Sequence, residues 1–466
     1  MNSTCICIFG AQYGDEAKGK LVCEIIDGFS KINDTVVCVR FNGGSNAGHS
    51  IYKKGVLFDT HVIPSGILES NCINVIGTGV LINPIQFLNE LSDIQTKFAN
   101  TFDSKTLGKI YISDRSHMTL LIHRYIDSIE GKQFGSTGSG ISQTMGDKAN
   151  RRGIQFGSLN TNNWKDQIIN IYKHYTDHFP SYFEDFEFNV TSLNQKYTFS
   201  NVRDMMNFEL QFIVLHLQKL MPYVTNTSAF LNNLDINVPI VFEGANSIML
   251  DSNIGYPNCT ATTCTIGGLL SGSDINVKFL NERNFKVIGV TKGYITRVGT
   301  GNLITEDFGE DGCTLQQNGQ EYGTTTGRAR RTGWFDAKLI EYTNTFCGYD
   351  YLNLTKLDVM SSFDKVKICV NYIHKTSLIT HCSRDFMDID STDYTPCYIT
   401  LDGWKDFDFS KCTCWDDLHP NVQKYIDTIE KIISIPVVYI NTGKEHGMTI
   451  IKSPASMNNY LEPQRD

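Results

Sequence analysis

Short apolar runs recur along the chain, each followed by a glycine-rich or polar segment. They occupy residues 5–9, 36–39, 73–76, 238–242, 287–290, 366–370 and 437–440. Runs of this length without polar alternation are typical of strands that are buried on both faces of a parallel sheet. The pattern therefore predicts an α/β fold with a large, mostly parallel central sheet, flanked by helices and related to P-loop proteins, with helical and loop excursions.

Two segments depart from this pattern. Residues 155–237 carry apolar and aromatic side chains at helical spacing, such as Met206 and Leu210, which predicts a mainly helical subregion that covers the sheet. Residues 374–395 are polar and rich in aspartate, so we expect an irregular insertion there. Because no linker-like stretch divides the chain, we expect residues 1–466 to form a single domain.

The composition is that of a soluble globular protein, with 41% hydrophobic and 20% charged residues. The net charge of −9 argues against sequence-wide attraction to nucleic acid or to anionic membranes. No apolar run approaches the roughly 18 residues needed to span a bilayer, and the N-terminus lacks a signal-peptide pattern. We therefore expect a cytoplasmic protein whose 14 cysteines are reduced thiols. The pair Cys412 and Cys414 lacks the second pair that a zinc site needs.

The first apolar run leads into the segment GAQYGDEAKGK and then into residues at helical spacing. A strand, a glycine turn and a helix aim backbone N–H groups and a helix dipole at an anion. Gly14, Gly19 and Lys20 have the spacing of a Walker phosphate loop, but Leu21 replaces the hydroxyl residue that binds Mg2+ there. Asp15 and Glu16 are unusual in a loop that contacts phosphate, unless a metal ion or a reacting proton lies nearby. This combination indicates a nucleotide enzyme rather than a generic ATPase.

Two further small-residue segments are candidates for nucleotide contact. RFNGGSNAGHS follows the run at residues 36–39 and contains His49, which suits either a role as acid or hydrogen-bond donor or a structural role. GSTGSG (135–140) precedes the paired Arg151 and Arg152, which suit a monophosphate. A flexible loop before a solvated basic helix end explains the second segment equally well.

Two later segments carry charges in an informative order. GTTTGRARRTG holds Arg328, Arg330 and Arg331, which suit carboxylates or phosphates in an otherwise acidic protein. LTKLD places Lys356 and Asp358 as in the guanine-recognition element of GTP-using proteins. A carboxylate accepts both the N1–H and the exocyclic N2–H of guanine, whereas adenine offers no such pair of donors. Together with the phosphate loop, this element favours GTP.

Taken together, these segments resemble the adenylosuccinate synthetase family. Six motifs occur in the family's order over most of the chain: GAQYGDEAKGK, RFNGGSNAGHS, FEGAN, TKGYITRVGTGNLITE, GTTTGRARRTGWFDA and NLTKLDV. The resemblance implies a ligase of purine nucleotide biosynthesis that makes adenylosuccinate, GDP and phosphate from GTP, IMP and L-aspartate through a 6-phosphoryl-IMP intermediate. It also implies one Mg2+ per subunit, GTP as a co-substrate, and a homodimer in which Arg151 reaches the neighbouring site.

The resemblance also assigns roles to single residues. The catalytic residues would be Asp15, which takes the N1 proton of IMP, His49, which donates to the transferring phosphoryl group, Lys18 and Asn246. The Mg2+ ligands would be Asp15 and the backbone carbonyl of Gly48. The GTP-binding residues would be Gly14, Asp15, Glu16, Ala17, Lys18, Gly19, Lys20, Gly48, His49, Ser50, Arg330, Lys356, Leu357, Asp358, Asn441, Thr442 and Gly443. The IMP-binding residues would be Asp15, Glu16, Ala17, Lys18, Asn46, Ala47, Gly48, His49, Thr137, Arg151, Asn246, Thr260 and Arg328. The aspartate-binding residues would be Thr324, Thr325, Thr326, Gly327, Arg328, Ala329 and Arg330.

The sequence departs from the family's pattern at a few of these positions. Asn246 stands where the family usually has glutamine, and its amide is one methylene shorter. Ser139 replaces a basic residue that helps to bind aspartate in the family. Ala17 and Ala329 are substitutions that the loops can tolerate. Because Asp15 and the arginine segment are intact, we expect an active enzyme.

Three alternatives stand beside this interpretation. A relative of the same class would use a guanylate acceptor and form a 2-amino adenylosuccinate. Asn246, at a base-contact position, is where such a switch would show, whereas Asp15 favours IMP. A GTP-binding regulatory or structural protein without turnover would bind GTP but release no phosphate with IMP and aspartate. A P-loop GTPase switch is disfavoured by Leu21 and by the arginine segment.

Overall fold

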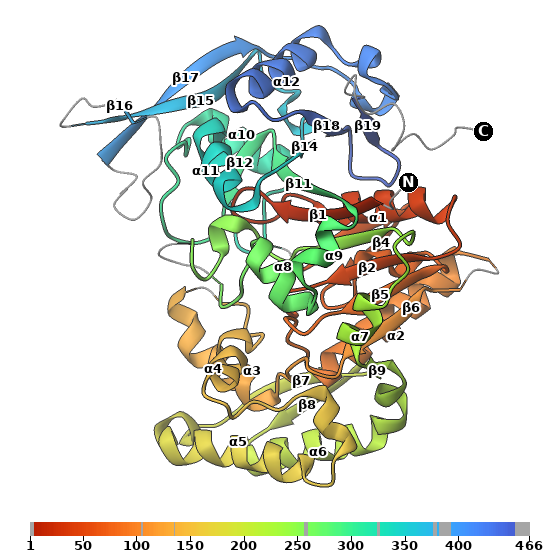
Figure 1. Cartoon of the computed structure of the whole chain (residues 1–466). Helices are drawn as coiled ribbons and strands as arrows, with labels where there is room; N and C mark the ends of the chain where they lie inside the picture. The colour runs from red at the N-terminus through yellow and green to blue at the C-terminus, as the bar shows by residue number, and fades with distance from the viewer. Residues whose placement is uncertain are drawn as a thin grey trace.

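A large sheet with helices around it organises the computed structural model (Figure 1). The model describes residues 4–103, 106–134, 136–255, 260–323, 327–375, 380–381 and 393–452. Within these residues the predicted α/β fold is confirmed. Figure 1 shows α5 (Trp164–His178), α6 (Val202–Leu220) and the hairpin of β7 (Phe188–Ser192) and β8 (Gln195–Phe199) at one end of the molecule. At the other end lie β15 (Lys365–His374), β17 (Tyr394–Asp402) and α12 (Pro420–Ile433).

Ten strands form the larger sheet, and each pairing in it is parallel except that of β18 with β19. Their order is β19 (Thr449–Ile451), β18 (Val437–Asn441), β14 (Tyr351–Thr355), β11 (Asn284–Lys292), β1 (Thr4–Gly10), β10 (Ile240–Glu243), β2 (Val36–Arg40), β5 (Cys72–Ile76), β6 (Lys109–Ser113) and β9 (Val224–Thr225). Six of the seven apolar runs therefore form strands of this sheet, as predicted.

The run at residues 366–370 was assigned to the wrong sheet. It lies in β15, which belongs to a second, five-stranded sheet. That sheet comprises β12 (Tyr294–Arg297), β13 (Arg331–Asp336), β15 (Lys365–His374), β16 (Thr380–His381) and β17 (Tyr394–Asp402). An apolar run reports burial but does not say which strands cover it. Here β15 pairs with β17 along most of its length, and several of its side chains are only half-buried.

Helices cover the larger sheet on both faces. Along β1, Cys5, Cys7 and Phe9 pack into one hydrophobic core together with residues of α11 and α12, whereas Ile6 and Ile8 pack into another with α1. This alternation explains why the first run is apolar at every position. The helices are α1 (Lys18–Ser30), α2 (Pro84–Thr101), α3 (Leu121–Glu130), α4 (Ile141–Ala149), α5 (Trp164–His178), α6 (Val202–Leu220), α7 (Thr227–Asn232), α8 (Ile266–Ser273), α9 (Val277–Asn281), α10 (Glu310–Asn318), α11 (Ala337–Cys347) and α12 (Pro420–Ile433).

The two segments that depart from the apolar pattern contain strands that their patterns did not predict. Residues 155–237 hold α5, α6 and α7, but also the antiparallel hairpin of β7 (Phe188–Ser192) and β8 (Gln195–Phe199) and the short edge strand β9. In residues 374–395, β15 ends and β17 begins, with β16 between them, and most of the other positions lie outside the described residues. Another antiparallel hairpin pairs β3 (His49–Lys53) with β4 (Val56–Thr60).

The expectations about membranes and thiols can also be compared with the described part of the chain. No helix there has both the length and the apolar character needed to cross a bilayer. The twelve cysteines that the structure describes are all free thiols. Burial raises the pKa of several of them, such as Cys5 to about 12, so these thiols are inert core residues.

Parallel pairing brings the polar segments of the sequence to one edge. Six neighbouring strands, β18, β14, β11, β1, β10 and β2, all run in the same direction. Their carboxyl ends are Asn441, Thr355, Lys292, Gly10, Glu243 and Arg40. Ligands of open α/β sheets bind outside the carboxyl ends of the strands. The motifs that follow these strands therefore meet at one candidate site.

Candidate active site

The loop after β1 adopts a backbone that presents its acidic pair in two directions. Gly14, Asp15 and Ala17 all have positive φ, at 102°, 60° and 69°. Helix α1 then begins at Lys18, and no side chain caps its first turn. The N-terminal N–H groups of α1 are therefore available to an anion, as the glycine turn predicts.

Glu16 points into the protein and organises this loop. Its carboxylate accepts hydrogen bonds from the backbone N–H of Gln12 (3.2 Å) and of Gly14 (2.8 Å) and from the Ser247 hydroxyl. Lys18 Nζ lies 2.8 Å from the second carboxylate oxygen. Burial would by itself raise the pKa of Glu16, but Lys18 and the hydrogen bonds from Ser247 and Gly14 together outweigh burial and lower the pKa. The side chain of Glu16 is thus engaged within the protein, and its backbone carbonyl accepts from the Thr355 hydroxyl at 3.2 Å.

His49 is held by a buried carboxylate at the end of β10. Its Nδ1 contacts Glu243 Oε1, and the same carboxylate accepts hydrogen bonds from the Ser65 hydroxyl and the Ser65 N–H, both at 2.7 Å. Burial lowers the pKa of His49, although Glu243 opposes this shift. The contact fixes the ring and leaves Nε2 as the nitrogen that can face a nucleotide.

The approach of His49 to α1 requires a glycine. A Cβ atom at Gly19 would lie 2.5 Å from the His49 Cβ, far inside van der Waals contact. The glycine spacing of the phosphate loop therefore does more than free the backbone for phosphate. It also brings the histidine of the second loop against the first turn of α1.

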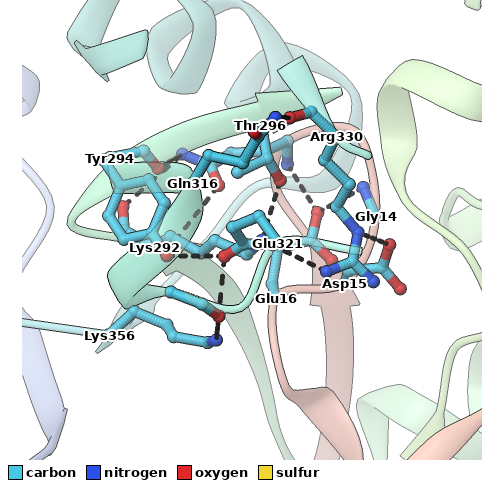
Figure 2. A network of polar contacts seen from close by, with 12 residues as sticks. Gly14, Asp15, Glu16, Lys292, Tyr294, Thr296, Gln316, Glu321, Arg330 and Lys356 are labelled. Atoms are coloured by element: carbon cyan, nitrogen blue, oxygen red, sulfur yellow. Dashed lines mark hydrogen bonds and ion pairs between the residues drawn. The ribbon is translucent and has the colours of Figure 1, made fainter. Parts of the chain in front are cut away.

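Asp15 points toward the arginine segment, as Figure 2 shows. Its Oδ2 lies 2.8 Å from Arg330 Nε, and its side chain stays 39% exposed. Arg330 also contacts Glu321, because Arg330 Nη1 donates a 2.7 Å hydrogen bond to the Glu321 carboxylate. Glu321 also accepts from Lys292 Nζ at 3.0 Å, and Lys356 Nζ lies 3.7 Å away. One polar network thus connects the proposed base with the guanine-recognition element.

The guanine element and the last loop lie at the same sheet edge. Asp358 follows β14 and is exposed, while Lys356 Nζ donates to the carbonyl of Gly319 at 2.8 Å. Lys20 donates to the backbone carbonyls of Gly443 and Met448, both at 2.7 Å. Lys20, a predicted GTP-binding residue, therefore contacts the loop that contains the predicted GTP-binding residues Thr442 and Gly443.

Among the described residues, four predicted site residues carry a buried polar atom without a hydrogen-bond partner. These atoms are Asn46 Oδ1, Asn246 Nδ2, Thr442 Oγ1 and Arg330 Nε, the last of which forms an ion pair with Asp15. An unpaired buried polar group costs about 1–3 kcal/mol, so such atoms are expected where a ligand completes the pairing. Asn246 also has a positive φ of 60°, which is uncommon outside glycine. Thr260 differs, because its hydroxyl donates to the carbonyl of Leu250 at 2.9 Å.

The segment around α4 reaches the site by packing. Ile141, the first residue of α4, lies directly against Gly44, since a Cβ there would be 2.5 Å from Ile141 Cδ1. Thr137 hydrogen-bonds the Ser139 hydroxyl at 2.7 Å in the loop before α4. Arg151 follows α4 with a φ of 61° and is exposed. The Arg151 N–H donates to the Lys148 carbonyl at 3.1 Å.

The remaining predicted residues are less informative. Ser50 is exposed and donates to Asp59 at 2.7 Å. Leu357 is buried, whereas Gly327, Arg328 and Ala329 are exposed. Ala47 and Gly48 are half-buried in the loop before His49. The predicted aspartate-binding residues Thr324, Thr325 and Thr326 lie outside the described residues.

The donor set at the loop fits a magnesium ion that substrates help to hold. Mg2+ prefers oxygen ligands and is usually bound through one or two carboxylates plus waters and phosphates. The half-exposed carboxylate of Asp15 and the backbone carbonyl of Gly48 are donors of this kind. Among the described residues, no group of three or more His, Cys, Asp or Glu side chains could hold a metal unaided.

Sequence reasoning missed the buried partners that hold these residues. Glu243 anchors His49, and Glu321 anchors Arg330. Asn42 ties two loops together, because it accepts from the Ala245 N–H at 2.8 Å and donates to the Thr263 carbonyl at 2.9 Å. Glu243 and Asn42 sit at strand ends inside recognised motifs, so their position was a usable signal. Glu321 carried no such signal.

The chain was compared with protein families and with curated proteins. The family model described as adenylosuccinate synthetase matches residues 7–450. The adenylosuccinate synthetase of Plasmodium falciparum (isolate 3D7) is 36% identical over 465 residues, covering 97% of this chain and 96% of that protein. The enzyme of Komagataella phaffii is 35% identical over 450 residues, covering 94% of this chain and 96% of that protein.

Solved structures agree with these matches. The fully ligated adenylosuccinate synthetase of Plasmodium falciparum superimposes with a TM-score of 0.81 at 34% identity, covering 96% of this chain and 99% of that one. A cyanophage succinoaminodeoxyadenylate synthetase bound to dGMP and dATP gives a TM-score of 0.59 at 17% identity, covering 98% of this chain and 97% of that one. The cyanophage protein therefore shares the fold. The chain itself belongs to the adenylosuccinate synthetase family of ligases.

Proposed function

We propose that this chain joins L-aspartate to IMP in the cytoplasm, in the step of purine biosynthesis that leads from IMP towards AMP. GTP is the co-substrate, and the products are adenylosuccinate, GDP and phosphate. The observation that carries the proposal is the convergence of Asp15, Lys18 and His49 at one sheet edge, next to a loop that holds Arg330. These groups suit a reaction in which a proton leaves a purine while a phosphoryl group is transferred.

In the first step, Asp15 takes the N1 proton of IMP, and O6 attacks the γ-phosphorus of GTP. The bond to the β–γ bridging oxygen breaks, which releases GDP and leaves 6-phosphoryl-IMP. Lys18 and the first turn of α1 stabilise the negative charge on the phosphates, and His49 donates to the transferring group. The exposure of the Asp15 side chain, at 39%, supports its access to a bound purine.

In the second step, the amine of aspartate attacks C6, the C6–O6 bond breaks, and phosphate leaves while the amine loses a proton. Exposed Arg328 and buried Arg330 suit the two carboxylates of the incoming aspartate. Asn46 and Asn246, with their unpaired buried atoms, suit the polar edge of IMP. Mg2+, held by Asp15 and the carbonyl of Gly48, would neutralise charge on the transferring phosphate.

Recognition of guanine is assigned to the loop after β14. Asp358 is exposed there and can accept from both donors on the guanine edge. Lys356 is fixed beside it by the Gly319 carbonyl, and Asn441, Thr442 and Gly443 lie at the carboxyl end of neighbouring β18. The buried Thr442 hydroxyl that lacks a partner supports a ligand at this end as well.

The acceptor can be tested directly with the purified chain. Mixed with Mg2+, GTP, aspartate and IMP, it is expected to form adenylosuccinate, which is followed by absorbance and by phosphate release. With GMP in place of IMP, the value of kcat/KM should be at least about 100-fold lower, because a hydrogen-bonding site rejects a mismatched base edge. Product with GMP and none with IMP would make the chain a guanylate-using enzyme. GTP binding without phosphate release from any mixture would show that the chain does not catalyse this reaction.

A homodimer with shared sites is part of the proposal, since exposed Arg151 suits the IMP phosphate in the neighbouring subunit. Arg151→Ala and Asp15→Asn should each be nearly inactive alone. If the chains exchange freely, an equimolar mixture is expected to regain about a quarter of wild-type activity, because half of the dimers then carry one intact site of two. Activity that stays at the level of the separate variants after exchange would contradict a shared site.

A further inference from the structure

Glu321 is a buried carboxylate outside the predicted site, and it lies at the centre of a cluster of cations. It is fully buried between the end of α10 and the arginine segment. Its oxygens accept from Lys292 Nζ at 3.0 and 3.1 Å and from the Tyr294 hydroxyl at 2.5 Å. Arg330 Nη1 donates to it at 2.7 Å, and Lys356 Nζ is 3.7 Å away. Figure 2 shows these side chains converging on the one carboxylate.

The cluster keeps Glu321 ionised. Burial would by itself raise its pKa, but the surrounding cations outweigh burial and lower the pKa to about 2. Three positive side chains thus depend on a single buried negative charge. Glu321 therefore does more than fill space in the core, because a neutral side chain at this position would leave buried positive charges without a counter-charge.

Arg330 has two carboxylate partners, and they differ in kind. The contact with Glu321 is an aligned hydrogen bond to a fully buried oxygen. The contact with Asp15 is an ion pair at 2.8 Å, but the N–H of Arg330 Nε does not point at the carboxylate well enough to form a hydrogen bond. The Asp15 side chain is also 39% exposed. The Arg330 main chain is fixed as well, because its N–H donates to the Glu321 carbonyl at 2.8 Å and its carbonyl accepts from Gln316 at 2.7 Å.

We infer that Glu321 is a positioning residue that anchors Arg330 permanently, so that Asp15 is the exchangeable partner and can turn from the guanidinium to substrate. The inference rests on the proposed function, in which Asp15 and Arg330 both act on substrates. Without the Glu321 charge, Arg330 keeps Asp15 as its sole carboxylate partner in this cluster and holds it away from IMP. The same carboxylate lies beside Lys356, so the anchor also adjoins the guanine-recognition element.

The test is a set of kinetic constants for Glu321→Gln, with Glu306→Gln as the matched control. Glu306 is a half-buried carboxylate that pairs with Arg331, the next residue after Arg330, at 2.8 and 2.9 Å. Glu321→Gln should lower kcat by about 10- to 100-fold, the usual range for a supporting partner, with the KM for IMP changed by less than about two-fold. Glu306→Gln should stay within about two-fold of wild type in both constants.

A second pair of variants separates positioning from general stability. In an Arg330→Ala background, Glu321→Gln should lower kcat by less than about two-fold further, because its effect passes through Arg330. Glu321→Asp keeps the charge but shortens the side chain, so it serves as the folded variant if Glu321→Gln lowers the melting temperature strongly. Its kcat should then also fall by about 10-fold or more.

Additive losses from Glu321 and Arg330, or a Glu321→Asp enzyme with wild-type kcat, would overturn the inference. So would a fall in kcat for Glu306→Gln equal to that for Glu321→Gln, since a general loss of packing would then explain both. Failure of the proposed function is a separate result, because the wild-type chain would itself form no adenylosuccinate.

Discussion

Asp15→Asn should abolish the formation of adenylosuccinate, with kcat lowered by about 1000-fold or more. A general base contributes about 100- to 10,000-fold, and this residue is also the proposed carboxylate ligand of Mg2+. Asparagine has the same shape but can neither take the N1 proton of IMP nor supply a negative oxygen. The measurement is single-turnover product formation with saturating IMP, GTP and aspartate, which separates chemistry from binding.

The control for this prediction is binding by the same variant. Glu16, Lys18 and the first turn of α1 are unchanged, so the affinity for IMP should stay within about ten-fold of wild type by calorimetry. The melting temperature should not fall, because Asp15 is half-exposed and its contact with Arg330 has no hydrogen-bond alignment. Turnover within ten-fold of wild type would remove Asp15 from the role of base.

Asp358→Asn should lower kcat/KM for GTP by about 100- to 1000-fold. A site that hydrogen-bonds a base loses much of its binding energy when one of its groups no longer matches the donors on that base. Asparagine cannot accept from both guanine donors, and its NH2 group faces the guanine N2–H as a second donor. Xanthosine triphosphate carries an oxygen at that position. It should therefore support turnover by the variant better than GTP does, whereas wild type should prefer GTP.

The internal control is the rest of the reaction. The KM values for IMP and aspartate should stay within about three-fold of wild type, because the guanine element contacts neither substrate. Unchanged GTP preference in Asp358→Asn would show that guanine is read elsewhere. In that case the exposed position of Asp358 after β14 would have no part in base recognition.

Much of the sheet could be predicted from the sequence because its strands are short, apolar and buried on both faces. Cys5 to Phe9 show this well, since neighbouring side chains enter different cores. The same signal misplaced the run at residues 366–370, because burial does not reveal which strands pair. The hairpin of β7 and β8 was missed although its side chains alternate between buried and exposed, because its strands are short and lie within a region of helical spacing.

The loops of the candidate site were predictable, but their supports were not. Glycines, lysines and acids within a motif keep a fixed spacing, so the loop after β1 could be recognised directly. His49 and Glu243, in contrast, are 194 positions apart, and only the pairing of β10 with β2 and β1 brings Glu243 to the site. Likewise, a glutamate before an arginine segment looks like any surface charge until folding buries it among cations.

Lys20 already has partners within the chain, and these contacts affect the free energy of nucleotide binding. Its ammonium group already holds two backbone oxygens, from Gly443 and Met448, between the last two strands of the large sheet. If a triphosphate binds Lys20, the lysine exchanges its hydrogen bonds to these two carbonyls for hydrogen bonds to phosphate. The free energy of binding is then the difference between the two sets of hydrogen bonds and not the sum of the new ones. Helix α1 and the loop between β18 and β19 are thereby coupled, because phosphates bound by Lys20 would change the hydrogen bonds of Gly443 and Met448.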